Sequence, residues 1–103
     1  MTEKRRPHHP LDAIKAQFRT STGFRITVSA QDFAFGVLGL SKDELAQLIS
    51  GIERRNFYKS MTSLRSRRIW QDVYHVPFEG MTLYMKFSAT DDGLFIVISL
   101  KEK

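Results

Sequence analysis

Apolar residues in the first part of the chain recur at the spacing of α-helices. A first helix is predicted after Pro10, a residue that suits the first helical turn. Its apolar positions are Leu11, Ile14 and Phe18. A second, short helix is predicted to begin at Ser29, which resembles a capping pair with Asp32, and to end at Gly39. The positions expected on its buried face are Ala30, Phe33, Ala34 and Val37.

The third predicted helix has the clearest pattern. Ser41 can cap it, and Glu44, three residues later, completes a capping box. Apolar residues then follow at i, i+3, i+4 and i+7, namely Leu45, Leu48, Ile49 and Ile52. Such a stripe is typical of a helix face that packs on a hydrophobic core.

From residue 57 onward the apolar period changes to two, which indicates β-strands. Alternation in the segment 82–88 places Tyr84 and Lys86 together on one face. The opposite face carries Leu83, Met85 and Phe87. Further strands are predicted at 57–63, 69–76 and 94–101. The last of these is almost continuously apolar, so we expect it in the centre of the sheet.

The links between the last three predicted strands are short. Glu79-Gly80 and Asp91-Asp92-Gly93 carry turn residues, and short links join antiparallel neighbours. The helices precede the strands, so the sequence predicts an α+β fold, an antiparallel β-sheet with N-terminal helices packed on it. A length of 103 residues corresponds to one domain, residues 1–103.

Composition excludes several classes of protein. The absence of cysteine rules out a disulfide framework, a zinc site built on thiolates and a thiol nucleophile. No apolar run approaches the roughly 20 residues of a membrane span. The basic segment 1–6 lacks the apolar stretch of a signal peptide. We therefore expect a protein of the cytoplasm that does not engage a membrane.

The net charge of +5 is concentrated in one stretch. Residues 53–68 contain six basic residues and one acid, Glu53, whereas the rest of the chain carries ten of each sign. The basic residues are Arg54, Arg55, Lys59, Arg65, Arg67 and Arg68. A polyanion is the natural partner of such a stretch, although arginine-rich turns are also common as merely solvated surface.

Familiar catalytic motifs are missing from the sequence. It has no phosphate-binding glycine loop, no His-Glu-x-x-His and no Gly-x-Ser-x-Gly. Three histidines are too few for a structural zinc site, and His8 and His9 are adjacent rather than spaced as ligands on one element. No metal or other cofactor is expected.

Polar side chains remain on the predicted strands. Alternation places Gln71 and His75 on one side of their strand with Ile69 and Val73, and Lys101 on one side with Ser99. It also places Lys59 with Phe57 and Met61. Because strand register cannot be read from the sequence, these faces cannot be brought together in space at this stage. Any one of these residues, taken alone, is better explained as part of the solvated face of a sheet.

Together these residues suit one reaction. RNA is cut without a metal when its own 2′-hydroxyl attacks the adjacent phosphate, if the protein removes that proton, stabilises the charged phosphate and protonates the leaving oxygen. Lysines stabilise developing charge, and a lysine or tyrosine with a shifted pKa can transfer protons. Gln71 can hydrogen-bond a base edge, a sugar or a phosphate. The lysines and the tyrosine that could surround one phosphate are Lys59, Tyr84, Lys86 and Lys101.

Several blocks of the sequence resemble the motility quorum-sensing regulator (MqsR) family of toxins. The blocks are residues 56–62 (Asn-Phe-Tyr-Lys-Ser-Met-Thr), 69–74 (Ile-Trp-Gln-Asp-Val-Tyr), 83–86 (Leu-Tyr-Met-Lys), 99–103 (Ser-Leu-Lys-Glu-Lys) and the opening 3–8 (Glu-Lys-Arg-Arg-Pro-His). The resemblance runs nearly end to end and is strongest after residue 56.

The resemblance implies a toxin with a RelE-like fold that acts as an mRNA interferase. Members of the family cut messenger RNA at short sequences, GCU-like for the best-known member, and arrest growth. They are neutralised by an antitoxin, MqsA-like here, with a zinc-binding domain and a DNA-binding helix-turn-helix domain. The zinc therefore belongs to the partner.

The family's catalytic residues fall on Lys59, Gln71, Tyr84 and Lys101, each retained as the same residue type. RNA binding is assigned to Arg54, Arg55, Arg65, Arg67, Arg68, His75 and Lys86. The departures are a histidine at 75 where arginine is expected, a more basic loop at 63–68, and a loose match over 17–38. They concern cleavage specificity and antitoxin pairing more than activity, and His75 could add proton-transfer capacity near pH 7.

Composition alone favours a different class of function. A non-catalytic RNA- or DNA-binding module needs only the basic stretch for phosphates and an aromatic residue for stacking, with Tyr58, Trp70 and Tyr74 as candidates. Trp70 and Tyr74 share strand parity among apolar neighbours, so we assign both to the core. The retained lysine, glutamine, tyrosine and lysine favour the nuclease.

Overall fold

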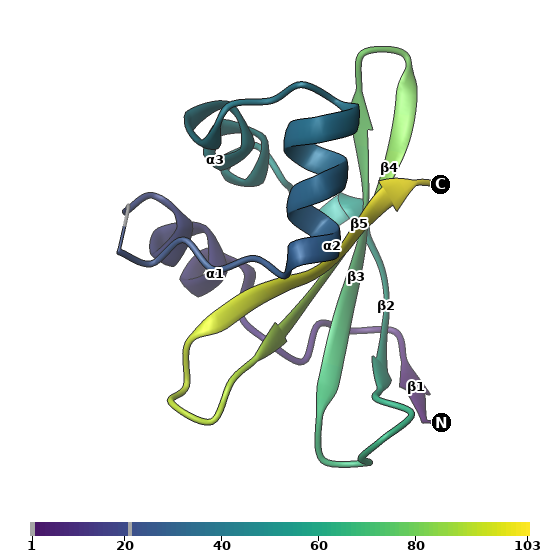
Figure 1. The fold of residues 1–103 in the computed structure, drawn as a ribbon. Helices are drawn as coiled ribbons and strands as arrows, with labels where there is room; N and C mark the ends of the chain where they lie inside the picture. Colours follow the sequence, from purple (N-terminus) through teal and green to yellow (C-terminus); the bar gives the residue numbers. More distant parts are fainter. Residues whose placement is uncertain (1, 21) are drawn as a thin grey trace.

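The computed structural model describes residues 2–20 and 22–103 and confirms the α+β fold. The helical elements are α1 (Leu11–Phe18), α2 (Val28–Gln31), the π-helix η1 (Asp32–Val37), α3 (Lys42–Ser50) and the short 3₁₀ helix η2 (Arg54–Asn56). The strands are β1 (Glu3–Lys4), β2 (Phe57–Thr62), β3 (Trp70–Phe78), β4 (Met81–Ala89) and β5 (Phe95–Glu102). The three α-helices gather on one side of the sheet (Figure 1). In the described part of the chain no helix is long and apolar enough to cross a membrane.

The five strands form one antiparallel sheet in the order β1-β2-β3-β4-β5. The predicted meander of the last four strands is thus confirmed, and the N-terminal strand β1 adds a fifth that the sequence pattern did not reveal. The β3–β4 hairpin turns at Glu79 and Gly80, whose φ angles are 46° and 80°. A two-residue turn of this kind matches the twist of the strands that it joins.

The strand β5 lies at an edge of the sheet, so its predicted central position is wrong. Its apolar composition has another reason: the segment before α2 covers the outer edge. The amide of Thr27 donates to the carbonyl of Val97 at 3.0 Å, and the amide of Val97 donates to the carbonyl of Arg25 at 3.0 Å. This parallel bridge, with α2 beside it, shields β5 from solvent as a neighbouring strand would.

The second helix begins earlier than predicted. Thr27 is its N-cap, because its hydroxyl accepts from the amide of Ala30, so the predicted cap at Ser29 with Asp32 is wrong. The helix then widens into η1, and the wider turn shifts later residues away from a face spaced for 3.6 residues per turn. Ala30 and Ala34 are buried as predicted, whereas Val37 is 71% exposed and lies outside the core.

The third helix forms as predicted. Ser41 Oγ accepts from the amide of Glu44 at 3.1 Å, and the Glu44 carboxylate accepts from the amide of Ser41 at 2.9 Å. The stripe Leu45, Ile49 and Ile52 is fully buried. The core lies between the helices and one face of the sheet, and its members from the strands are Tyr74, Val76, Leu83, Met85, Phe87, Val97 and Leu100.

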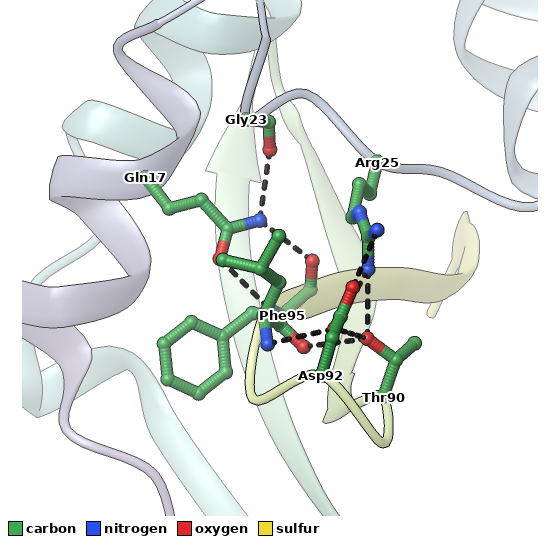
Figure 2. Close-up of polar contacts among 7 residues, drawn as sticks. Gln17, Gly23, Arg25, Thr90, Asp92 and Phe95 are labelled. Carbon is green, nitrogen blue, oxygen red and sulfur yellow. Dashed lines mark hydrogen bonds and ion pairs between the residues drawn. The ribbon is translucent and has the colours of Figure 1, made fainter.

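A polar network ties α1 and the segment after it to the start of β5 (Figure 2). Gln17 Nε2 donates to the carbonyls of Gly23 and Phe95 at 2.8 and 2.7 Å, and its Oε1 accepts from the amide of Phe95 at 2.7 Å. In the β4–β5 turn, Asp92 pairs with Arg25 at 2.8 Å and also accepts from the Thr90 hydroxyl. These contacts fix one end of β5, the strand that carries Lys101 towards its other end.

Candidate active site

The strand register brings the predicted catalytic side chains to one face of the sheet. Tyr84 on β4 lies opposite His75 on β3 and opposite Lys101 on β5. One step along, Lys86 lies opposite Val73 and Ser99, and Val73 lies opposite Lys59. Directly paired residues point to the same face. This face is the one turned away from the helices, because the alternate residues of β4 are buried against them.

Lys59 reaches this face because β2 is bulged. The register shifts between Phe57 and Lys59, so Phe57 pairs with Tyr74 and packs on it with ring centroids 5.6 Å apart. The predicted sharing of one face by Phe57 and Lys59 is therefore wrong, since a bulge shifts the alternation by one residue. Met61 does share the open face, because it pairs with Gln71.

Tyr84 is the centre of the cluster. The ammonium nitrogens of Lys101 and Lys86 lie 5.1 and 5.7 Å from the centre of its ring, and the His75 ring lies 6.1 Å away. Burial raises the pKa of Tyr84, and the positive charge of Lys59 opposes that shift. The phenol hydroxyl therefore keeps its proton at neutral pH.

The pKa of Lys86 is lowered, first by burial and then by the positive charges of Lys101 and Lys59. Its ammonium has no carboxylate partner among the described residues to counter these effects. A lysine in such surroundings releases its proton more readily than a solvated lysine. The pKa of Lys59 is raised whereas that of Lys86 is lowered, so these two lysines differ in how firmly they hold their protons.

His75 lies between two tyrosines of the same face. Its ring stacks on the Tyr58 ring at 4.3 Å, with an angle of 20° between the planes, and tilts towards Tyr84. Burial and the charge of Lys103 lower the pKa of His75 below its usual value. The imidazole is therefore neutral at pH 7 and presents a flat aromatic surface with Tyr58.

Gln71 lines a pocket of about 430 Å³ beside this cluster. The pocket shares Lys86 with the Tyr84 cluster and takes Arg65 from the loop between β2 and β3. Its remaining lining residues are Met61, Thr62, Ser63, Leu64 and Ile98. Amide, guanidinium and ammonium groups thus border a hollow with apolar walls, an arrangement that suits a nucleobase and its phosphate.

The basic stretch is divided by β2 into two separate groups. Arg54 and Arg55 lie before the strand in η2, where Arg55 pairs with Glu53 at 3.1 Å and Arg54 stacks over Phe57 at 4.9 Å. The loop arginines, Arg65, Arg67 and Arg68, follow the strand. A six-residue strand separates the groups by roughly 20 Å. Of these arginines, Arg65 lines the pocket of Gln71, whereas Arg68 lines a different pocket beside Trp70.

The N-terminal segment contributes a residue that sequence reasoning missed. Glu3 on β1 pairs with Lys59, with its carboxylate oxygen 2.8 Å from the ammonium nitrogen. A two-residue strand has no periodicity to detect, so nothing in the apolar pattern pointed to it. The assignment of Trp70 to the core was also wrong. Trp70 is half-buried and lies outside the core, because its ring is covered by His8, with ring centroids 5.1 Å apart, and not by a helix. Tyr74 is fully buried, as predicted.

Comparison with known proteins agrees with the resemblance recognised in the sequence. The family model described as "Motility quorum-sensing regulator, toxin of MqsA" matches residues 6–102. The protein named mRNA interferase toxin MqsR from Escherichia coli (strain K12) is 34% identical over 106 aligned positions, which cover 98% of this chain and 99% of the relative. The chain belongs to the motility quorum-sensing regulator family of toxins.

Proposed function

We propose that the protein is the toxin of a toxin–antitoxin pair and an endoribonuclease, an mRNA interferase like its relative from Escherichia coli. The single observation that supports this most is the convergence of Lys59, Tyr84 and Lys101 on one open face, with Lys86 among them. Lysine side chains around a protonated phenol suit a phosphate that gains negative charge. RNA is cut when the 2′-hydroxyl attacks the adjacent phosphate, and the reaction needs no metal ion.

The pKa shifts suggest how the work is divided. The raised pKa of Lys59 keeps its ammonium charged, so that it stabilises the pentavalent phosphate. Lys101 lies beside Tyr84 and contacts the same phosphate. The lowered pKa of Lys86 suits it to accept the proton of the 2′-hydroxyl, and the Tyr84 hydroxyl is placed among the cations to protonate the leaving oxygen. Gln71 hydrogen-bonds the base or sugar next to the cut, which gives the enzyme its preference for short, GCU-like sequences.

The loop arginines hold the RNA strand beside the site. Arg65 shares the pocket with Gln71, while Arg67 and Arg68 extend the basic surface away from it. His75 and Tyr58 offer a stacking surface for a base. Arg54 and Arg55 lie at the far end of β2, so they would contact only a longer RNA. The antitoxin partner is expected to be MqsA-like, with a zinc-binding domain and a helix-turn-helix domain, and the toxin to act as one domain in the cytoplasm.

A non-catalytic RNA-binding module remains the second candidate, because the stacked pair of Tyr58 and His75 would bind bases without any chemistry. The two functions separate when a labelled RNA is incubated with the protein in excess EDTA. Discrete fragments are the expected result. Intact RNA with a retarded band in a native gel would favour the binding module.

The site assignment is tested by the variants Lys59→Ala, Gln71→Ala, Tyr84→Ala and Lys101→Ala. Loss of one contact to the transition state lowers the rate on the order of a hundredfold. Each variant should therefore relieve growth arrest on induced expression and cut RNA slowly in single-turnover assays. Arg19→Ala is the matched control, because Arg19 is exposed and lies just after α1, on the helical side. If all four variants stayed as active as this control, the assignment would be wrong.

A further inference from the structure

Glu3 is the acidic side chain that enters the candidate active site. β1 pairs with β2 in the register Glu3 to Met61 and Lys4 to Ser60, so Glu3 lies on the open face, diagonal to Lys59. Its carboxylate oxygen and the Lys59 ammonium nitrogen are 2.8 Å apart. The described residues form three ion pairs, and the other two, Arg25 with Asp92 and Arg55 with Glu53, lie away from this face.

Several contacts hold β1 against β2. On one side of Glu3, the amide of Thr2 donates to the hydroxyl of Thr62 at 2.9 Å, and the amide of Thr62 donates to the carbonyl of Thr2 at 2.8 Å. On the other side, the amides of His8 and His9 donate to the buried carboxylate of Asp72 at 3.1 and 2.8 Å. Glu3 is therefore held between two anchors, unlike a side chain on a frayed terminus.

The same segment packs on the end of β3. His8 stacks on the Trp70 ring with 14° between the planes, and the Lys4 ammonium lies 4.2 Å from the centre of that ring. His9 Nε2 lies within hydrogen-bonding distance of the Trp70 carbonyl at 3.1 Å. A two-residue strand alone could not fix a side chain, but these contacts make its position part of the fold.

We propose that Glu3 is a positioning residue of the active site: its carboxylate orients the Lys59 ammonium towards the scissile phosphate. The proposal rests on the proposed ribonuclease function. Glu3 occupies one of the three N–H groups of Lys59 and leaves the others free for an anion. A flexible lysine held in this way loses less freedom when the substrate arrives, which speeds the chemical step.

The surroundings of Lys59 support this role. The groups that act on its charge are Glu3 from β1, Tyr58 from its own strand and Tyr84 from β4. The hydrogen bond that Lys59 donates to Glu3 is the largest cause of its raised pKa. Lys86, in the same cluster without such a partner among the described residues, has a lowered pKa. Glu3 thus makes Lys59 the lysine that keeps its proton, and the two lysines become suited to different tasks.

Two other roles for the pair make different predictions. An ion pair at the surface contributes little, so its loss would leave catalysis unchanged. A carboxylate that stands in the place of the substrate phosphate would inhibit the enzyme, so its loss would speed cleavage at low RNA concentration. A positioning residue alone predicts a slower chemical step with RNA affinity unchanged or higher, because a negative charge beside the polyanion is removed.

The variants Glu3→Gln, Glu3→Asp and Glu102→Gln separate these roles. Glu3→Gln removes the charge at nearly constant shape, and Glu3→Asp keeps the charge but shortens the side chain. Glu102→Gln makes the same charge change at an exposed position on β5 whose carboxylate belongs to none of the described ion pairs. Single-turnover cleavage of a labelled RNA gives the maximal rate and the affinity across pH, and ¹³C NMR of the lysine side chains gives the pKa of Lys59, assigned with Lys59→Ala.

The expected result for Glu3→Gln is a maximal rate lower by about tenfold to a hundredfold. The pKa of Lys59 should fall, and the alkaline limb of the rate profile should move to lower pH with it. Glu3→Asp should lie between Glu3→Gln and the wild type, and Glu102→Gln should match the wild type. The fluorescence of Trp70, which packs against the N-terminal segment, reports whether each variant keeps that segment in place.

If the Glu3→Gln variant cleaved RNA at the wild-type maximal rate or faster, the positioning role would be overturned, while the ribonuclease function would stand. A wild-type protein that leaves RNA uncut would overturn the proposed function, and the positioning role with it. If Glu102→Gln lowered the maximal cleavage rate as much as Glu3→Gln does, the proposal would also be contradicted, because the change in net charge alone would then explain the effect.

Discussion

Replacing Asp72 tests how the N-terminal segment is held on the sheet. The Asp72 side chain is fully buried, and its carboxylate accepts from the Ser60 hydroxyl at 2.6 Å and from the amides of His9 and His8 at 2.8 and 3.1 Å. Hydrogen bonds to a charged group contribute about 1.5–3 kcal/mol each. Asp72→Ala breaks all three.

The expected loss in free energy of unfolding depends on which of the freed groups can form a new hydrogen bond with water. The two shorter hydrogen bonds together contribute about 3–6 kcal/mol, and relief from burying a negative charge offsets part of this. His8 is exposed, so its amide regains water. We expect Asp72→Ala to lower the free energy of unfolding by about 3 kcal/mol, and Ser60→Ala, which removes one partner, by about 2 kcal/mol.

Urea unfolding measures the difference. With a slope of about 1.5 kcal/mol per molar urea, a loss of about 3 kcal/mol lowers the midpoint by about 2 M. Asp91→Ala, at an exposed turn position, is the control and should stay within about 0.5 kcal/mol of the wild type. Trp70 is the single tryptophan of the chain and contacts His8, so its fluorescence should change before the far-UV circular dichroism in Asp72→Ala. A midpoint for Asp72→Ala within about 0.3 M of the control would refute the assigned role of the carboxylate.

Three further predictions follow from the geometry. Changing Arg65, Arg67 and Arg68 together to alanine should flatten the slope of log affinity for single-stranded RNA against log salt by about two units. The cleavage rate at saturating RNA should fall little. An unchanged slope would mean that these arginines make no phosphate contacts. The Tyr74 hydroxyl is buried and has no hydrogen-bond partner among the described residues, and burial raises its pKa to about 12. Tyr74→Phe should therefore keep or raise the melting temperature. A fall of several degrees would show that the hydroxyl does have a partner. The pKa of Asp92 is lowered from 3.8 to about 2 by the hydrogen bonds that it accepts from Thr90, Leu94 and Arg25, so its stabilising effect is present above about pH 4 and is lost as the pH falls towards 2. Asp92→Asn should therefore weaken the acid dependence of the free energy of unfolding in that window. An unchanged acid dependence would contradict this role of Asp92.

The sequence predicted those parts of the fold that depend on local pattern. The capping box at Ser41 and Glu44 and the alternation around Tyr84 are local signals, and both are confirmed. The position of β5 depended on what covers its edge, namely the segment around Ile26 from far along the chain. The start of the second helix was missed because Thr27, Ser29 and other residues nearby are all acceptable caps, and only the backbone decides among them.

The candidate site could be predicted in its residue types but not in its geometry. Alternation placed Tyr84 and Lys86 together, whereas the meeting of Lys59 with them required the register of three strands and the bulge at Tyr58. Neither feature leaves a mark in the periodicity. Glu3 lay beyond any such reasoning, because its partner is 56 residues away and its strand is two residues long.

The most direct test of the proposed reaction compares two substrates that differ in one oxygen. A short RNA is cut by the protein in EDTA, the cleavage site is mapped, and the nucleotide 5′ of the cut is replaced by its 2′-deoxy analogue. If the 2′-hydroxyl is the nucleophile, the RNA yields a fragment ending in a 2′,3′-cyclic phosphate or a 3′-phosphate, and the deoxy substrate stays intact at that position. Continued cutting of the deoxy substrate, or a fragment that ends in a free 3′-hydroxyl, would contradict the proposed chemistry.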